Sequence, residues 1–263
     1  MTEPTVKTAF EKTFDNVADD YDRIRPDYLE AIYQDIFRFR PITPQSRVLE
    51  IGMGSGKATA PFLKTGCHLT ALEPGEHLAA IAAARYADCQ NLTIHTQTLQ
   101  DYDCPDNTYD LIYAATAFHW IPEEYGYERV FRLLKQGGVF ARFAYHAGPD
   151  LSRPALAEDI QKVYARCKPQ NSKPLLFGAE HAAALAALAA KYGFCDTNSY
   201  IYHTTKDFTA AEYRKLLTTY SDHMALDESL RTQLFDGICQ AIEHHGGVIT
   251  IHYVMDLELA RKC

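Results

Sequence analysis

The segment RVLEIGMGSGKAT, residues 47–59, joins an apolar run to three glycines at alternate positions. VLEI (48–51) has the residue types of a buried strand, and Gly52, Gly54 and Gly56 follow it directly. Glycine adopts backbone angles that other residues avoid, and it leaves the main chain accessible because it lacks a Cβ atom. The segment therefore predicts a sharp turn from a strand into a helix. Two interpretations remain open: a tight turn without a ligand, or a turn shaped so that a cofactor can lie against the backbone.

Apolar runs of strand length recur through the first 145 residues, with helical segments between them. Strands are expected at residues 48–52, 68–73, 92–96, 109–115 and 138–145. Helices are expected at residues 29–39 and within PFLKTG, EHLAAIAAARYA and PEEYGYERVFRLLKQ. Strands that alternate with helices favour a parallel sheet covered by helices on both faces.

The second half of the chain has a different pattern. Four prolines punctuate residues 147–178, which predicts an insertion of short helices and loops. Residues 179–193 favour a helix that stops at Gly193, and residues 198–208 could form a strand. EYRKLLTTYSDHM and ESLRTQLFDGICQAIEHHG are expected to form two further helices.

The last segment, GGVITIHYVMDLELA, alternates between apolar and polar residues. Strict alternation is typical of a strand with unlike faces, often antiparallel and near the edge of a sheet. No internal repeat, low-complexity tract or linker divides the sequence. We therefore expect residues 1–263 to form one domain.

Composition excludes several classes of function. The chain has 26 Lys and Arg against 34 Asp and Glu, a net charge of −8, and no basic block, so nucleic acid is not an expected partner. The seven cysteines are scattered and form no C-x-x-C, which argues against a disulfide framework and a thiolate zinc site. No signal-peptide core or membrane-length apolar run occurs, and no H-E-x-x-H or similar spacing indicates a metal. A cytoplasmic protein without membrane association is the expectation.

A second acid strengthens the ligand interpretation of the glycine turn. Glu73 ends the next apolar run, in LTALEPGEHL, where an acid in a doubly wound sheet can accept hydrogen bonds from both ribose hydroxyls of an adenosine. The glycine spacing is G-x-G-x-G, and it differs from the G-x-G-x-x-G of pyrophosphate-binding turns. The pair of signals therefore favours an adenosine-containing cofactor over a dinucleotide.

With these motifs the chain resembles the class I S-adenosylmethionine-dependent methyltransferases, and the resemblance runs over nearly the whole sequence. It is carried by VLEIGMGSG, LEPGEHL, YDLIYAATAFHW (109–120) and LLKQGGVF (133–140), in that order. The pair His119 and Trp120 is similar to a branch that acts on small molecules. NVADDYDRIRPDY (16–28) and LTTYSDH (217–223) also resemble segments of that branch.

The resemblance implies a doubly wound, Rossmann-like α/β sheet of seven strands, mostly parallel with the last antiparallel, and helices on both faces. It implies S-adenosylmethionine as cofactor and S-adenosylhomocysteine as product. It also implies a cofactor-covering segment at about residues 1–40 and a substrate cover at about residues 147–195. The residues implied to bind the cofactor are Tyr21, Arg25, Glu50, Gly52, Gly54, Gly56, Glu73, Pro74, Thr98, Leu99 and Ala115.

Within this set the resemblance assigns separate contacts. Glu50 is implied to hold the cofactor's ammonium group and Glu73 its ribose diol. Thr98 and Leu99 are implied to contact the adenine, although Gln97 stands where the family commonly has an acid before that pair. The hydrogen bond that an acidic side chain would accept from the adenine amine is therefore not expected at Gln97.

Methyl transfer from a sulfonium is an in-line displacement that depends mainly on alignment, so no catalytic triad is required. A general base is needed only if the acceptor loses a proton, and His119 is the candidate, with a structural histidine as the alternative. The predicted acceptor pocket consists of His119, Trp120, Tyr145 and Tyr220. Each of the last three could instead have a packing or loop role.

The sequence therefore predicts a methyltransferase acting on a small-molecule acceptor, as a monomer or homodimer and without a metal. Two other functions remain open. A nicotinamide oxidoreductase is disfavoured by the glycine spacing. A non-catalytic protein that binds S-adenosylmethionine or S-adenosylhomocysteine for regulation is compatible with the same motifs, because this reaction has no obligatory catalytic residue.

Overall fold

The structure of the chain is a computed structural model that describes residues 24–168 and 176–263. These residues group into two compact units. The larger unit contains residues 27–145, 178–202 and 255–263, and the smaller unit contains residues 24–26, 146–168, 176–177 and 203–254. The predicted single domain, covering segment and substrate cover stay predictions.

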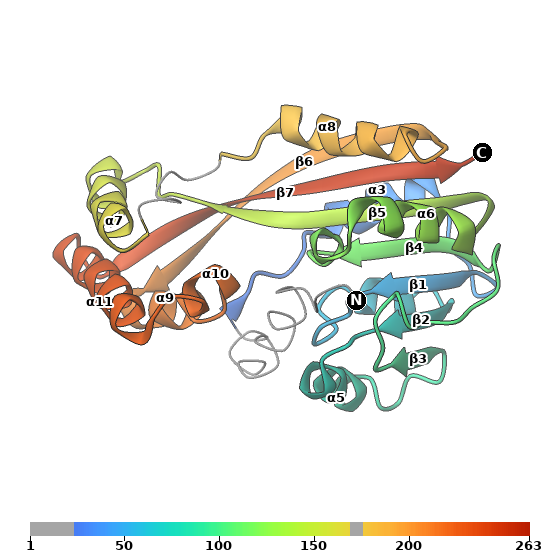
Figure 1. The fold of residues 1–263 in the computed structure, drawn as a ribbon, viewed down its shortest axis with the longest axis horizontal. Helices are drawn as coiled ribbons and strands as arrows, with labels where there is room; N and C mark the ends of the chain where they lie inside the picture. Colours follow the sequence, from blue (N-terminus) through green and yellow to red (C-terminus); the bar gives the residue numbers. More distant parts are fainter. Residues whose placement is uncertain (1–23, 169–175) are drawn as a thin grey trace, which may run out of the picture. The chain divides into compact units, whose positions relative to one another are not determined.

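One seven-stranded sheet runs through the chain, in the order β3-β2-β1-β4-β5-β7-β6. Its strands are β1 (Arg47–Ile51), β2 (His68–Leu72), β3 (Leu92–His95), β4 (Tyr109–Ala115), β5 (Leu134–Gly148), β6 (Phe194–Thr209) and β7 (Val248–Lys262). Strands β1 to β5 pair in parallel, and β7 runs in the opposite direction (Figure 1). The predicted fold class and the antiparallel last strand are confirmed.

Helices accompany the strands of the larger unit. They are α3 (Glu30–Phe39), α4 (Ala60–Leu63), α5 (Glu76–Arg85), the short 3-10 helix η1 (Phe118–Trp120), α6 (Glu123–Leu133) and α8 (Ala179–Ala190). Apolar residues at helical spacing on α3, among them Ile32, Tyr33 and Ile36, are buried. This burial of one helix face explains why the sequence folds there as an amphipathic helix.

The two faces of β4 support different clusters. Tyr113 stacks on Phe62 of α4 at 3.9 Å between ring centroids, and Tyr33 of α3 meets the edge of the same Phe62 ring. Ile112 belongs to the cluster that includes Val130 of α6. Successive side chains of a strand point to opposite faces, so a strand buried on both faces is apolar throughout. This explains why YDLIYAA is an almost continuous apolar run.

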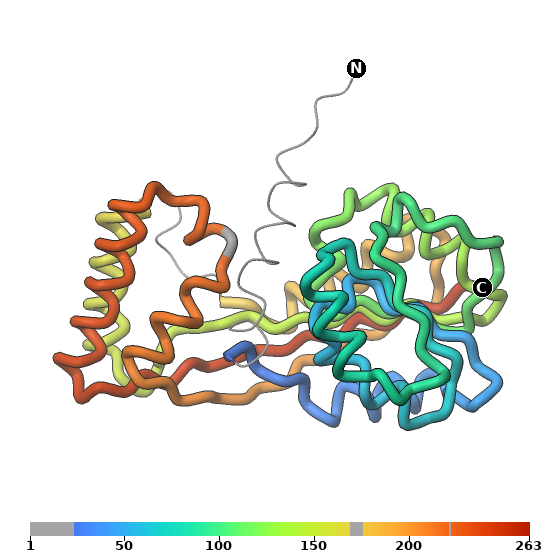
Figure 2. Tube along the Cα trace, turned by 90° about the horizontal axis from the view of Figure 1, so that it is seen from below, coloured from blue at the N-terminus to red at the C-terminus, as the bar shows by residue number. Residues whose placement is uncertain are grey.

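The smaller unit consists of helices and the outer ends of β5, β6 and β7. Its helices are α7 (Pro154–Cys167), α9 (Ala210–Leu217), α10 (Ser221–Met224) and α11 (Glu228–His244). Helix α11 packs against both α7 and α9, and its course beside α7 is visible in Figure 2. Asp150 connects β5 to β7, because its Oδ2 accepts a hydrogen bond from the Thr250 N–H at 3.1 Å.

Two local predictions differ from the structure. Residues 154–167 form one helix of 14 residues, where short helices and loops were expected, because Pro154 occupies the first helical turn and needs no N–H there. The helix expected to continue through LLKQ ends at Leu133, and β5 begins at Leu134. Gly137, in the left-handed region at φ +72°, lies within this early part of β5.

Strand β7 departs from the alternating pattern near its end. Its apolar face is buried as predicted, but Asp256 and Glu258 on the other face are buried too. The strand lies between β5 and β6, so neither of its edges is open to solvent. Burial and the neighbouring Asp256 raise the pKa of Glu258 to about 10, and Arg142 on β5 approaches it at 3.9 Å.

One disulfide corrects the interpretation of the cysteines. Cys195 and Cys263 are bonded, with their Cα atoms 6.0 Å apart, and the other five cysteines are free. The pair is 68 residues apart in the sequence, so spacing did not reveal it. It joins the start of β6 to the residue that follows β7.

Among the described residues, no helix has both the length and the apolar character needed to cross a bilayer.

Candidate functional site

The glycine turn follows β1 at the edge where parallel strands end. The N–H groups of Gly52 and Met53 both donate to the Leu72 carbonyl at the end of β2, each at 2.9 Å. Gly52, Gly54 and Gly56 have φ values of +70°, +58° and +86°. These angles lie in the left-handed region, which favours glycine, so the conformation explains the residue type at all three positions.

The three glycines nevertheless have different surroundings. A Cβ atom at Gly52 would lie 2.5 Å from the Ala117 Cβ, and one at Gly56 would lie 2.6 Å from Cε2 of Tyr86. A Cβ at Gly54 would meet no atom of residues 24–168 and 176–263 within 4 Å. The first and third glycines therefore allow the turn to pack against the protein. The middle one exposes main chain to open space.

Glu73 is buried beside this open backbone, with only 6% of its surface exposed. Its Oε2 accepts a hydrogen bond from the Gly54 N–H at 2.6 Å, and its Oε1 accepts one from the Gly75 N–H at 2.8 Å. The carboxylate therefore joins the turn after β1 to the turn after β2. Pro74, between these partners, is exposed. The structure brings Glu73 and the predicted glycine turn into direct contact.

Glu50, on β1, is almost completely buried at 1% exposure. Its Oε2 accepts a hydrogen bond from the Thr59 hydroxyl at 2.7 Å. Among residues 24–168 and 176–263, its Oε1 makes no hydrogen bond of good geometry, although the Tyr113 hydroxyl of β4 lies near enough to lower the pKa of the carboxyl. Burial raises the pKa of Glu50 to about 8, and the nearby Glu73 contributes to the increase. A buried carboxyl oxygen without a hydrogen bond of good geometry is costly, so this position favours a ligand that carries a hydrogen-bond donor or a positive charge.

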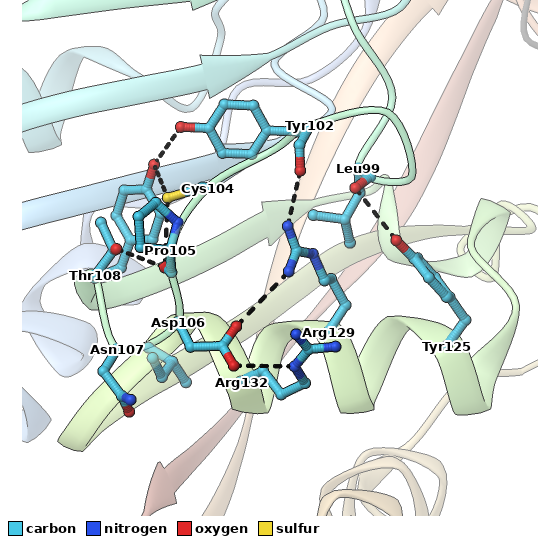
Figure 3. A network of polar contacts seen from close by, with 12 residues as sticks. Leu99, Tyr102, Cys104, Pro105, Asp106, Asn107, Thr108, Tyr125, Arg129 and Arg132 are labelled. Atoms are coloured by element: carbon cyan, nitrogen blue, oxygen red, sulfur yellow. Dashed lines mark hydrogen bonds and ion pairs between the residues drawn. The ribbon is translucent and has the colours of Figure 1, made fainter.

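The segment predicted to contact adenine follows β3 and is attached to α6 (Figure 3). The Tyr125 hydroxyl donates to the Leu99 carbonyl at 3.4 Å, and Arg129 donates to the Tyr102 carbonyl at 2.8 Å. Leu99 itself is buried in the cluster beneath α6. Thr98 donates its hydroxyl proton to Asp101 at 2.6 Å, which holds the following turn. These contacts fix the backbone at residues 98–102 without using a ligand.

The end of β4 contains an unusual residue that sequence reasoning did not single out. Thr116 follows Ala115 and has φ +52°, although β-branched residues rarely adopt left-handed angles. Its hydroxyl shares a hydrogen bond with the Tyr28 hydroxyl at 2.7 Å. Ala115 is half-buried. Tyr28 was the last residue of the quoted 16–28 segment, but no sequence signal distinguishes Thr116.

His119 and Trp120 lie next to each other on η1, with ring centroids 4.9 Å apart. His119 is exposed and Trp120 is half-buried, whereas the preceding Phe118 is buried against Tyr127 of α6. Phe118 therefore anchors the short helix. The two predicted pocket residues remain at the surface of the larger unit.

The remaining predicted residues lie in different parts of the chain. Tyr145 is buried in the larger unit, 5.8 Å from the Tyr28 ring. Arg25 and Tyr220 belong to the smaller unit, where the Arg25 guanidinium lies 4.4 Å above the Tyr220 ring and donates to the Thr219 carbonyl at 2.7 Å. Tyr21 lies outside the described residues.

No group of three metal-ligating side chains occurs in the part of the chain that the structure describes.

Comparison with known proteins agrees with this geometry. A family model described as a methyltransferase domain matches residues 48–138. These residues include the glycine turn, Glu73 and the His119–Trp120 pair. An uncharacterized methyltransferase of Schizosaccharomyces pombe is 24% identical over 238 residues, which cover 84% of this chain and 88% of the relative.

Solved structures establish the likeness of the fold. The YcgJ protein of Bacillus subtilis is 14% identical with a TM-score of 0.58, over 89% of this chain and 99% of that one. Phosphoethanolamine N-methyltransferase 2 of Haemonchus contortus, solved with phosphomonomethylethanolamine and S-adenosylhomocysteine, is 17% identical with a TM-score of 0.57. That alignment covers 100% of this chain and 61% of the Haemonchus protein. In its strand order, its glycine turn with a neighbouring acid and the methyltransferase-domain match over residues 48–138, the chain is similar to the class I S-adenosylmethionine-dependent methyltransferases.

Proposed function

We propose that the chain binds S-adenosylmethionine at the turn after β1 and transfers its methyl group to a small-molecule acceptor. The observation that carries the proposal is the contrast among the three glycines, of which Gly54 alone faces open space. A ligand can approach the main chain closely only where no Cβ and no protein atom intervene. Glu73 contacts the same residue, so a carboxylate and an open backbone occur together.

The residues of this region fit the cofactor. The Glu73 carboxylate offers about four acceptor positions in total, so it can hold a ribose diol in addition to or in exchange for backbone donors. The Oε1 of Glu50 fits a positively charged ammonium group, which would also lower the pKa of this buried acid. Thr98 and the backbone of the buried Leu99 are proposed to contact the adenine ring, and Pro74 and Ala115 complete the proposed contacts.

Bound S-adenosylmethionine would supply a methyl group already activated by a positive sulfur. The task of the chain is then to orient the acceptor and to exclude water. Trp120 and Tyr145, both in the larger unit, are proposed to line the acceptor site, and the role of Tyr220 stays a prediction from the resemblance. His119, exposed beside Trp120, is the proposed proton acceptor for a substrate that must lose a proton.

The choice of a small molecule as acceptor rests on two observations. The chain has a net charge of −8 and no basic block, which disfavours nucleic acid. The Haemonchus protein was solved in complex with phosphomonomethylethanolamine and S-adenosylhomocysteine.

We further propose Tyr21 and Arg25 as contacts at the carboxylate end of the cofactor. A cytoplasmic monomer or homodimer is proposed as the working form.

The proposal is tested by incubating the purified chain with isotopically labelled S-adenosylmethionine and a small-metabolite extract. Mass spectrometry should detect a labelled compound below the size of a protein, together with S-adenosylhomocysteine in equal amount. Calorimetry with S-adenosylhomocysteine, measured in parallel, separates binding from turnover. Binding without any labelled product from extracts of several organisms would contradict methyl transfer to a small molecule.

A further inference from the structure

The smaller unit contains a cavity of about 330 Å³, and of the residues named for the acceptor site only Tyr220 lines it. The end of β5, one face of α7, the segment from α9 to α10, and β7 surround it. Ile160, Ile249 and Ile251 form an apolar wall, and Ala157 adds a small side chain on α7. A volume of this size lies at the lower end of the range for sites that bind small molecules.

Lys168 brings a positive charge to this cavity. Its ammonium group forms an ion pair with Asp222, and both residues line the space. The Lys168 side chain is 8% exposed, whereas the Asp222 side chain is 58% exposed. The buried partner of the pair is therefore the cation. Among the described residues, Asp222 provides the one hydrogen bond of Nζ, although an ammonium group can donate three.

The other ionisable groups on the wall leave the remaining donors of the Lys168 ammonium unused. Asp150 directs its carboxylate to the backbone, where Oδ1 accepts from the Ser152 N–H at 3.0 Å and Oδ2 from the Thr250 N–H. Burial lowers the pKa of His223, so this imidazole is neutral near pH 7. A second cation lies close by, because the Arg25 guanidinium stacks on the Tyr220 ring that lines the cavity. The two cations, Lys168 and Arg25, thus equal the two acids, Asp150 and Asp222, in formal charge, and the capacity to bind an anion lies in the unused donors of the buried Lys168 ammonium.

The hydrogen bonds of His223 define how the neighbouring phenol is oriented. Nδ1 lies 3.4 Å from the Leu217 carbonyl, which can only accept, so Nδ1 carries the proton. Nε2 then accepts the hydroxyl proton of Tyr164 at 3.3 Å. Tyr164 is thus held by a partner within the unit. Burial raises the pKa of Tyr213, which lines the same space and remains a neutral O–H donor.

We propose that this cavity binds a small organic carboxylate, with its anionic group on the Lys168 ammonium and its apolar part against Ile160, Ile249 and Ile251. A carboxylate would use the donors of a buried ammonium that Asp222 leaves unused. An amine would instead have to compete with Lys168 for Asp222 at the exposed side. The inference goes beyond the proposed function, because binding here depends on the smaller unit and holds whether or not this ligand is methylated.

The test compares three probes of equal length on the full chain: hexanoate, hexanamide and hexylamine. Binding is measured by saturation-transfer NMR and calorimetry at pH 7. Hexanoate should bind about tenfold more tightly than the amide or the amine. Lys168→Met should weaken hexanoate binding about tenfold, and Lys168→Arg should retain most of it. Lys162→Met is the matched control, because Lys162 lies on α7, which ends just before Lys168, and its side chain is 64% exposed.

A second variant tests the cavity even if Lys168→Met fails to fold. Ala157→Phe places a large side chain in the cavity without removing a charge, and it should abolish hexanoate binding while circular dichroism stays unchanged. Equal binding of hexanoate and hexanamide, preference for hexylamine, or no binding of any probe would overturn the proposal. S-adenosylhomocysteine affinity, measured on the same samples, should be unchanged in both variants. A wild-type chain that failed to bind S-adenosylhomocysteine would contradict the proposed function while leaving the hexanoate result valid.

Discussion

The Glu73 carboxylate accepts a hydrogen bond from the backbone N–H of Gly54 at 2.6 Å, across 19 positions of sequence. Gly54 is also the glycine of the turn that faces open space. The acid at the end of β2 therefore both holds the turn after β1 and borders the space into which that turn opens. The carboxylate therefore has a structural contact and a proposed ligand contact at once.

Glu73→Ala should weaken the binding of S-adenosylhomocysteine at least about tenfold, because the proposed ribose contact and the support of Gly54 are both lost. Calorimetry measures the affinity. Glu76→Ala is the matched control, since Glu76 begins α5 three residues later and is exposed. Unchanged affinity in Glu73→Ala would remove this residue from the cofactor site.

Gly54→Val should abolish cofactor binding while the circular dichroism spectrum remains that of a folded protein. A side chain there fills the open space, and the left-handed backbone adds strain of about 1–2 kcal/mol. Gly137→Val is a close control, because Gly137 has φ +72° and a Cβ atom there would also meet no atom within 4 Å. It lies near the start of β5, so it should carry similar strain and bind normally. Equal loss of binding in both variants would show that strain alone is responsible.

Binding of S-adenosylhomocysteine should release protons near pH 7. Burial raises the pKa of Glu50 from 4.5 to about 8, so the free protein holds this carboxyl mostly protonated, and an ammonium ligand favours the charged form. Affinity should then increase with pH by up to about tenfold per pH unit, and it should level off above about pH 8. Calorimetry in buffers of different ionisation enthalpy measures the protons released.

Glu50→Gln provides the control for this pH dependence. The amide does not titrate, so proton release should vanish and the affinity should lose its dependence on pH. The raised pKa also means that the folded state binds more protons than the unfolded state between pH 4.5 and about pH 8. The Glu50 contribution to the free energy of unfolding therefore falls as pH rises through this range. Persistent proton release in Glu50→Gln would assign the titration to another group.

His119→Asn should reduce turnover about a hundredfold if the acceptor must lose a proton, and it should leave cofactor affinity unchanged. The side chain is exposed and borders Trp120, so its removal should not disturb the core. His68→Asn is a suitable control, because His68 is exposed and begins β2 at the opposite edge of the sheet from η1. Normal turnover in His119→Asn would leave the residue with a structural role.

Reduction of the Cys195–Cys263 disulfide should lower the free energy of unfolding by up to about 4 kcal/mol, the value expected from the entropy of closing a loop of this length. Thermal unfolding with and without dithiothreitol measures the change. Cys263→Ser should match the reduced protein and should not respond to dithiothreitol. An identical melting temperature of the wild-type chain in both conditions would contradict a stabilising cross-link.

Much of the larger unit could be predicted because its signals are local. An apolar run such as YDLIYAA forms a strand wherever both of its faces are covered, and glycines at alternate positions mark a turn regardless of what surrounds it. The residues of β1, its turn and Glu73 therefore lie together as expected. Helix α7 was mispredicted because the effect of a proline depends on its position. Proline breaks a helix in its interior but is accepted in the first turn, where Pro154 lies.

Other properties arise from residues that are distant in sequence. The Ala117 Cβ and the Tyr86 ring determine that Gly52 and Gly56 face protein while Gly54 faces open space. Glu258 lies on the polar face that alternation predicted, but it is buried there beside Arg142 of β5.

Residue order along the chain was thus enough to identify the strands and the turn, because side-chain periodicity and backbone conformation depend on near neighbours. Which carboxyl is protonated, which glycine is accessible and which cysteines pair depended on the folded arrangement. Burial and electrostatic interaction are set by atoms brought together across the sheet, and the linear spacing of residues carries no measure of that distance.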